Sequence, residues 1–180
     1  MAKTVRHGGG VQPPDQPTEQ LRLRPPRHRV SPRAVTWWTT QAILLAVTTL
    51  IVPVVGLIVW PGARPWLVAV TLALAVLAVA YVLVMPRWRF RVHRWETTDD
   101  AVYTSAGWIN QEWRVAPMSR IQTVDAERGP LQQLFGLATV TVTTASAAGA
   151  LRLEGLDHPL AIDLVDQLTK TTQATPGDAT

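Results

Sequence analysis

Two long runs without a charged side chain constrain this sequence more than any other feature. The first covers residues 35–60, 26 in all, and the second covers residues 66–85, 20 in all. A helix rises 1.5 Å per residue, so about 20 residues cross the roughly 30 Å hydrocarbon core of a bilayer. A helix also satisfies its own backbone hydrogen bonds, which lipid cannot do. The two runs therefore predict a transmembrane hairpin over residues 35–86.

The connector between the runs, residues 61–65, predicts a tight turn with both flanks on one side of the membrane. It contains one arginine, whereas five lie at residues 22–33 just before the first helix and four at residues 87–94 just after the second. An excess of Lys and Arg marks the cytoplasmic flanks of membrane helices. We therefore expect a multi-pass protein of the cell membrane with both termini in the cytoplasm. A cleaved signal peptide is the alternative for the first run, but that run is too long and lacks a small-x-small cleavage site.

The two ends of the sequence predict disorder. Residues 1–34 contain three consecutive glycines, many prolines and few large apolar side chains, so they bury too little surface to offset the entropy of ordering the chain. Residues 173–180 form a similar short tail. The hairpin and residues 87–172 are left as the parts expected to fold.

From residue 87 onward the apolar pattern predicts short strands. Strict alternation over Arg87–His93 is typical of a strand with one basic face, and further strands are expected over 101–105, 108–115, 121–127, 137–144 and 151–154. Residues 97–100 read as a turn, and Pro117 should end the strand before it. Ile121 and Val124 fall on opposite faces, which indicates a bulge. Val140 and Val142 should point inward, with Thr139, Thr141 and Thr143 outward.

Two helical segments are expected in the same region. Residues 129–136 begin and end with glycine and predict a single helical turn closed by Gly136. An apolar stripe predicts an amphipathic helix after Asp157, a candidate N-cap; its members are Leu160, Ala161, Leu164, Val165 and Leu168. Several short strands and a terminal helix predict a small barrel or a strongly bent sheet, with the helix over an open end.

Four stretches carry a family resemblance. They are Pro86–Phe90, the run Gly-Trp-Ile-Asn-Gln-Glu-Trp-Arg-Val-Ala-Pro at 107–117, Ser-Arg-Ile-Gln-Thr-Val at 119–124, and Gly-Pro-Leu-Gln-Gln-Leu-Phe-Gly-Leu-Ala at 129–138. Together with the hairpin they resemble the bacterial pleckstrin-homology (PH) membrane proteins of the YdbS-like family, over residues 35 to 170. The resemblance implies a PH-like domain: two bent antiparallel sheets and a C-terminal helix. The family brings no settled activity, and fold does not imply function. Eukaryotic PH domains often hold phosphoinositides with basic residues around the first loop between strands. In this sequence that turn, at 97–100, is acidic, so the resemblance does not imply phosphoinositide binding.

The candidate site residues form two groups. The first comprises arginines that directly follow the second helix and could attract anionic headgroups: Arg87, Arg89, Arg91 and Arg94. The alternative is that these arginines only set the topology. The second group comprises large apolar side chains that could anchor a partner or fill the core: Trp108, Trp113, Leu131, Leu134 and Phe135. Trp108 and Trp113 should lie on opposite faces of one strand.

The sequence contains few groups suited to catalysis. It has no cysteine, His93 and His158 are isolated, and no phosphate-binding glycine loop or nucleophile motif is present. We expect no enzyme, cofactor, metal site, nucleic-acid partner or small-molecule substrate. The first hypothesis is a membrane-anchored binding or scaffold module with the lipid bilayer and a protein partner or homo-oligomer. A subunit of a membrane transport or envelope-defence complex is the alternative.

Overall fold

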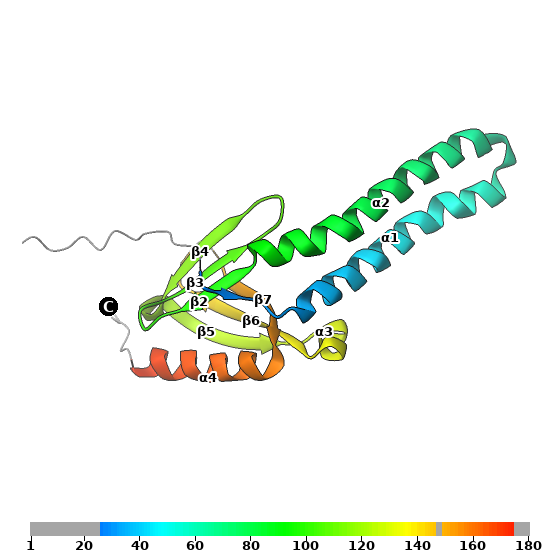
Figure 1. Cartoon of the computed structure of the whole chain (residues 1–180). Coiled ribbons are helices and arrows are strands. Elements are labelled where there is room, and N and C mark those ends of the chain that lie inside the picture. The colour runs from blue at the N-terminus through cyan, green and yellow to red at the C-terminus, as the bar shows by residue number, and fades with distance from the viewer. Residues whose placement is uncertain (1–25, 147–148, 175–180) are drawn as a thin grey trace, which may run out of the picture.

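The computed structural model describes residues 26–146 and 149–174 and has an elongated helical hairpin joined to a compact domain (Figure 1). Helix α1 (Arg33–Val59) and helix α2 (Arg64–Val92) pack side by side and are joined by a 3-10 turn, η1 (Pro61–Ala63). Both are long and apolar enough to cross a membrane. The predictions for residues 1–25 and 175–180 fall outside the described residues.

The strand predicted over Arg87–His93 is wrong. Helix α2 continues past the charge-free run and ends at Val92. Near this end of the helix Met85 and Pro86 are buried, Arg89 and Phe90 are half-buried, and His93 just beyond the end is buried, which is a helical spacing; Val92 is also half-buried. The alternation of arginines with apolar residues was accidental, because Arg89 turns toward the domain while Trp88 faces outward.

The domain contains two antiparallel sheets. The first has the order β1 (His28–Arg29), β2 (Arg94–Thr97), β3 (Ala101–Ala106) and β4 (Glu112–Pro117). The second has the order β5 (Ile121–Glu127), β6 (Leu137–Thr144) and β7 (Leu151–Asp157). Within the described residues the strands do not close into one barrel, which corrects that part of the fold prediction. Two bent sheets with a C-terminal helix, α4 (His158–Ala174), are present as expected.

Several local predictions are confirmed. The chain turns at residues 98–100, β4 ends at Pro117, and the register of β5 on β6 shifts between Ile121 and Thr123. Helix α3 (Pro130–Phe135) is followed by Gly136 in the left-handed conformation. Val140 and Val142 are fully buried.

Four other predictions need correction. Residues 28–29, expected to be disordered, pair with β2 as an edge strand, because Val30 and Ser31 are buried in the domain. Trp108 lies in the β3–β4 loop and not in a strand. Thr139, expected to point outward, is buried and accepts a hydrogen bond from Gln132 at 2.8 Å. Leu160 is exposed, although Ala161, Leu164 and Leu168 of the same stripe are buried.

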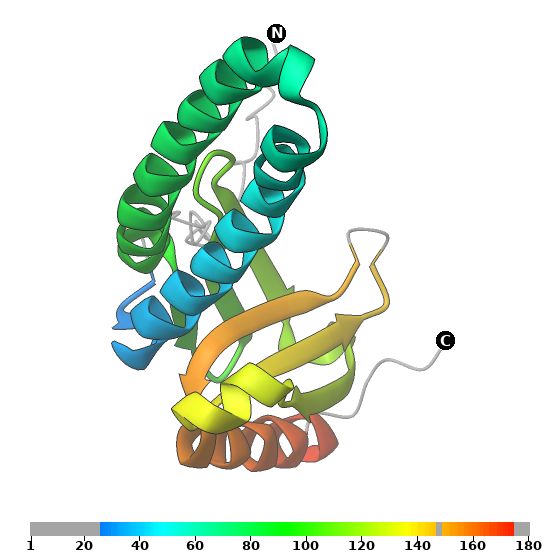
Figure 2. The ribbon, with the colours of Figure 1, turned by 90° about the vertical axis from the view of Figure 1, so that its right-hand side faces the viewer.

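The core lies between the two sheets and α4. Val102 of β3, Val140 and Val142 of β6 and Leu156 of β7 are fully buried, and α4 packs across β5 and β6 with Leu164 and Leu168. The first turns of α1 enter the same core. Figure 2 shows α3 and α4 on the side of the domain formed by the second sheet, with the hairpin rising above it.

Candidate functional site at the base of the hairpin

The base of α1 is packed inside the domain. Ala34, Trp37, Trp38 and Ala42 are buried, and Trp38 is completely covered. Gly155 of β7 makes this approach possible: its φ is +76°, and a Cβ added there would lie 2.8 Å from the Cβ of Ala34. The amide of Ser31 also donates a hydrogen bond to the carbonyl of Gly155 at 2.9 Å. The two tryptophans, Trp37 and Trp38, therefore belong to the domain core.

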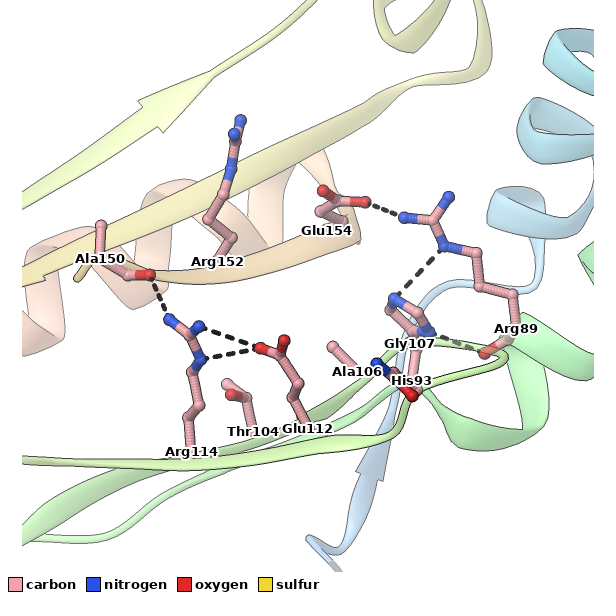
Figure 3. A pocket seen from close by; sticks show the side chains of 11 residues that line it. Arg89, His93, Thr104, Ala106, Gly107, Glu112, Arg114, Ala150, Arg152 and Glu154 are labelled. Carbon is pink, nitrogen blue, oxygen red and sulfur yellow. Dashed lines mark hydrogen bonds and ion pairs between the residues drawn. The ribbon is translucent and has the colours of Figure 1, made fainter. Parts of the chain in front are cut away.

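Arg89 joins three elements at this base. Its guanidinium lies 4.7 Å from the centroid of the Trp38 ring on α1, and its Nη2 is 2.6 Å from Oε2 of Glu154 on β7. Its Nε donates to Nε2 of His93 at 3.4 Å. These contacts are drawn in Figure 3, apart from Trp38. A cation between an aromatic face and a carboxylate, all partly shielded from water, is stabilised by both partners.

His93, directly after α2, is held in its neutral form. Its Nδ1 lies 2.9 Å from the carbonyl oxygen of Arg89, so Nδ1 carries the hydrogen and donates it. Nε2 then accepts the hydrogen bond from Arg89 Nε, and a proton on Nε2 would oppose that donor. Burial, with the positive charge of Arg89 as the second cause, lowers the pKa of His93 to about 4. The ring also packs on Trp38, with centroids 5.0 Å apart.

A polar cavity of about 350 Å³ opens beside this cluster (Figure 3). It lies between β3, β4 and their loop on one side and β7 on the other. Arg114 of β4 crosses part of the gap: its Nη1 donates to the carbonyl of Ala150 at 3.1 Å, and its Nε donates to Glu112 at 3.0 Å. Three arginines and two glutamates line the cavity, so it presents both signs of charge; they are Arg89, Arg114, Arg152, Glu112 and Glu154.

Two more cavities adjoin the first. One of about 670 Å³ lies on the α3 side, where Trp37 and Gln41 of α1 face Leu131 and Gln132 of α3. Arg89 and Glu154 line both of these cavities. Another of about 200 Å³ lies farther along β4, where Trp113 and Arg114 face the β6–β7 connection. Arg114 lines both the first and the last, so these two cavities adjoin along a seam between β4 and β7, which are the ends of the two sheets.

The predicted basic face does not form one surface. Arg87 and Arg91 are exposed on α2, and Arg87 donates to the carbonyl of Leu83 at 2.7 Å. Arg89 is turned inward to Glu154, and Arg94 is half-buried in β2. The helical continuation of α2 separates these side chains by 100° per residue, whereas a strand would have placed the first three on one face.

The predicted apolar anchors also separate. Trp108 is half-buried with its ring 5.7 Å from that of Tyr81, and Trp113 is 44% exposed on β4. Leu131 and Phe135 pack against the core, whereas Leu134 is 79% exposed. Sequence reasoning missed Trp38, Glu154 and Arg152 altogether. The four-residue spacing of Arg89 and His93 was the one available signal, because it fits a helix face.

Residues 26–146 and 149–174 contain no group of three or more histidine, aspartate or glutamate side chains arranged to hold a metal. The seam instead offers guanidinium and carboxylate groups at fixed positions, and these bind ionic or backbone polar groups. The Arg89 and Arg114 ion pairs are only partly covered, with side-chain exposures of 26% and 40%, so a ligand can compete for them.

A model of the bacterial PH domain family matches residues 41–172. The chain belongs to that family. The matched region begins within α1, so it includes most of the hairpin as well as the domain. The chain is also 26% identical over 162 residues to the UPF0699 transmembrane protein YdbS of Bacillus subtilis (strain 168), covering 85% of this chain and 97% of that one. No solved structure matches. The two apolar helices of this chain, together with this relative, identify it as a bacterial PH-domain membrane protein.

Proposed function

We propose that this bacterial PH-domain protein is a non-enzymatic module that holds a segment of a partner protein at the cytoplasmic face of the cell membrane. The open seam between β4 and β7 carries the proposal. Both strands end their sheets within the described residues, and an extended segment can pair with such an edge through its backbone. The row of cavities along the seam provides room for its side chains.

The charges along the seam indicate what kind of segment fits. Arg114 and Glu112 lie on β4, and Arg152 and Glu154 lie on β7, so both walls carry both signs. A segment with alternating basic and acidic side chains complements such walls better than a uniformly acidic or basic one. The buried junction with the hairpin supports a scaffold role, because it keeps the seam at one height relative to the membrane.

Site-specific photocross-linking in cells tests the proposal. A benzophenone amino acid replaces Trp113 on one wall of the seam and, separately, Ser146 on the other. We expect both positions to give the same discrete adduct, identified by mass spectrometry as a protein segment. The adduct should weaken when Arg114→Glu places a second carboxylate beside Glu112. An adduct with twice the mass of the chain would identify the partner as a second copy.

The same probe at Gln167, an exposed position on α4 that lines none of these cavities, provides the matched control. Equal adducts from Gln167, or no adduct from either seam position under any growth condition, would contradict the proposal. Orientation is tested separately by reporter fusions at Thr180 and in the turn at residues 61–63. A cytoplasmic reporter should be active at Thr180 and inactive in the turn.

A further inference from the structure

We infer that the domain itself enters the inner leaflet at two apolar points, one on each side of the hairpin. The first point is Trp108–Ile109 in the β3–β4 loop, and the second is Leu134 on α3. The inference rests on the proposed placement of the hairpin across the membrane. It makes the bilayer a binding partner of the domain and not only of its anchor.

The β3–β4 loop reaches along α2 into the charge-free run. Trp108 packs edge-on against Tyr81, with ring centroids 5.7 Å apart. Tyr81 lies eleven residues before the end of α2 at Val92, a rise of about 16 Å along the helix. It also lies inside the run predicted to cross the bilayer. A side chain that touches Tyr81 is therefore at the depth where the membrane begins.

The shape of this loop projects Ile109 outward. Gly107 has φ +107°, and a Cβ added there would lie 1.8 Å from the carbonyl oxygen of Asn110, so the loop folds closely over this position. Ile109 at its tip is 76% exposed. An isoleucine held in water by a tight turn is unfavourable, whereas the same side chain among acyl chains is stabilised.

Helix α3 forms the second point, beside α1. Leu131 lines a cavity together with Gln41, which is exposed two residues before Ile43, where the exposed apolar part of α1 begins. Leu131 and Phe135 pack against the core, and Leu134, which lies between them on the turn, is 79% exposed. Figure 1 shows α3 beside the start of α1 and the β3–β4 loop beside the end of α2, so the two points flank the hairpin.

These two side chains differ from the rest of the domain. The other exposed large apolar residues in the described part of the domain are at most 45% exposed: Trp113, Leu160 and Ile162. Ile109 and Leu134 belong to segments that contact hairpin residues inside the charge-free runs. A bilayer around the hairpin reaches both points at once. Arg33, Arg87 and Arg91, exposed at the same base, suit the anionic headgroups there.

The absence of cysteine from the sequence allows a direct test. Single cysteines are introduced as Ile109→Cys and Leu134→Cys, labelled with an environment-sensitive fluorophore, and reconstituted in lipid nanodiscs. Both sites are exposed, so the changes leave the core intact. We expect blue-shifted emission and quenching by nitroxide lipids that place the label roughly 5–10 Å into the headgroup and acyl boundary.

Two controls separate this inference from the placement of the hairpin. Ser119→Cys, exposed beyond the other end of β4, should remain in water, and Val76→Cys, exposed in the middle of α2, should be quenched most deeply. If Val76→Cys is quenched while Ile109→Cys and Leu134→Cys behave like Ser119→Cys, the insertion of the domain is refuted alone. If Val76→Cys also behaves like Ser119→Cys, the membrane placement of the hairpin is refuted.

Discussion

The lower and upper parts of the hairpin have similar apolar compositions but different surroundings. In the lower part Trp37, Trp38 and Ala42 of α1 and Met85 of α2 are buried by the domain. In the upper part, from Ile43 to Val59 and from Trp66 to Val84, many large apolar side chains are exposed. The lower part is therefore held by protein packing and is sensitive to shape, whereas the upper part needs only to be apolar and long enough.

Replacing Trp38 should show the largest difference between the lower and upper parts in the free energy of unfolding that a substitution costs. Trp38 is fully buried and also lies under the Arg89 guanidinium, so Trp38→Ala leaves a cavity and removes a cation–π contact. We expect a loss of about 4 kcal/mol in the free energy of unfolding, measured by chemical denaturation in detergent. Trp66→Ala, which removes a 75% exposed side chain in the upper part, is the control. Equal losses at both sites would remove the distinction.

Gly155→Ala should be the next largest effect. The added Cβ meets Ala34 at 2.8 Å, and the residue must keep a left-handed conformation. We expect a loss of about 3 kcal/mol in the free energy of unfolding. Gly149→Ala isolates the collision, because Gly149 has a similar φ of +80° but nothing within 4 Å of the added Cβ. A Gly149 variant as unstable as the Gly155 variant would show that only backbone strain matters.

Acidification should lower the stability of the fold through His93, at the base of the hairpin. Its pKa is about 4 in the folded protein and near 6.5 when unfolded, so the unfolded chain binds the proton first as the pH falls through this window. Stability is complete above pH 6.5 and decreases below it, by about 2 kcal/mol at pH 5. Thermal unfolding of the protein and of His93→Gln at pH 8 and pH 5 measures the effect. An equal loss in the variant would assign the pH dependence to other groups.

The ion pair of Arg89 with Glu154 should give the smallest effect. Both side chains are about one quarter exposed, so solvent screens them in part. Glu154→Gln should cost about 1 kcal/mol in the free energy of unfolding. Glu127→Gln is the matched control, since its contact with Arg152 is 3.8 Å long and more than half exposed. Equal losses in the two variants would show that partial burial does not strengthen the ion pair of Arg89 with Glu154.

The accuracy of the sequence predictions depends on how local their causes are. Helix α3 and strand β6 were predicted correctly because turn glycines and alternating valines determine the backbone conformation over only a few residues. The strand predicted at Arg87–His93 was wrong because the four-residue spacing of Arg89 and His93 also fits a helix face, and the contacts of Arg89 with Trp38 and Glu154 lie on that face. Those partners are about 50 and 65 residues away in the sequence, so no local pattern could reveal them.

The sequence by itself determined the two apolar helices, the change to short strands after them and the terminal amphipathic helix, because length, charge and period act within each segment. The tertiary structure decided that the first turns of α1 lie inside the domain and that the two sheets remain open along β4 and β7. It also decided which exposed apolar tips lie beside the hairpin. These features depend on how distant segments exclude water from one another, and no single segment carries that information.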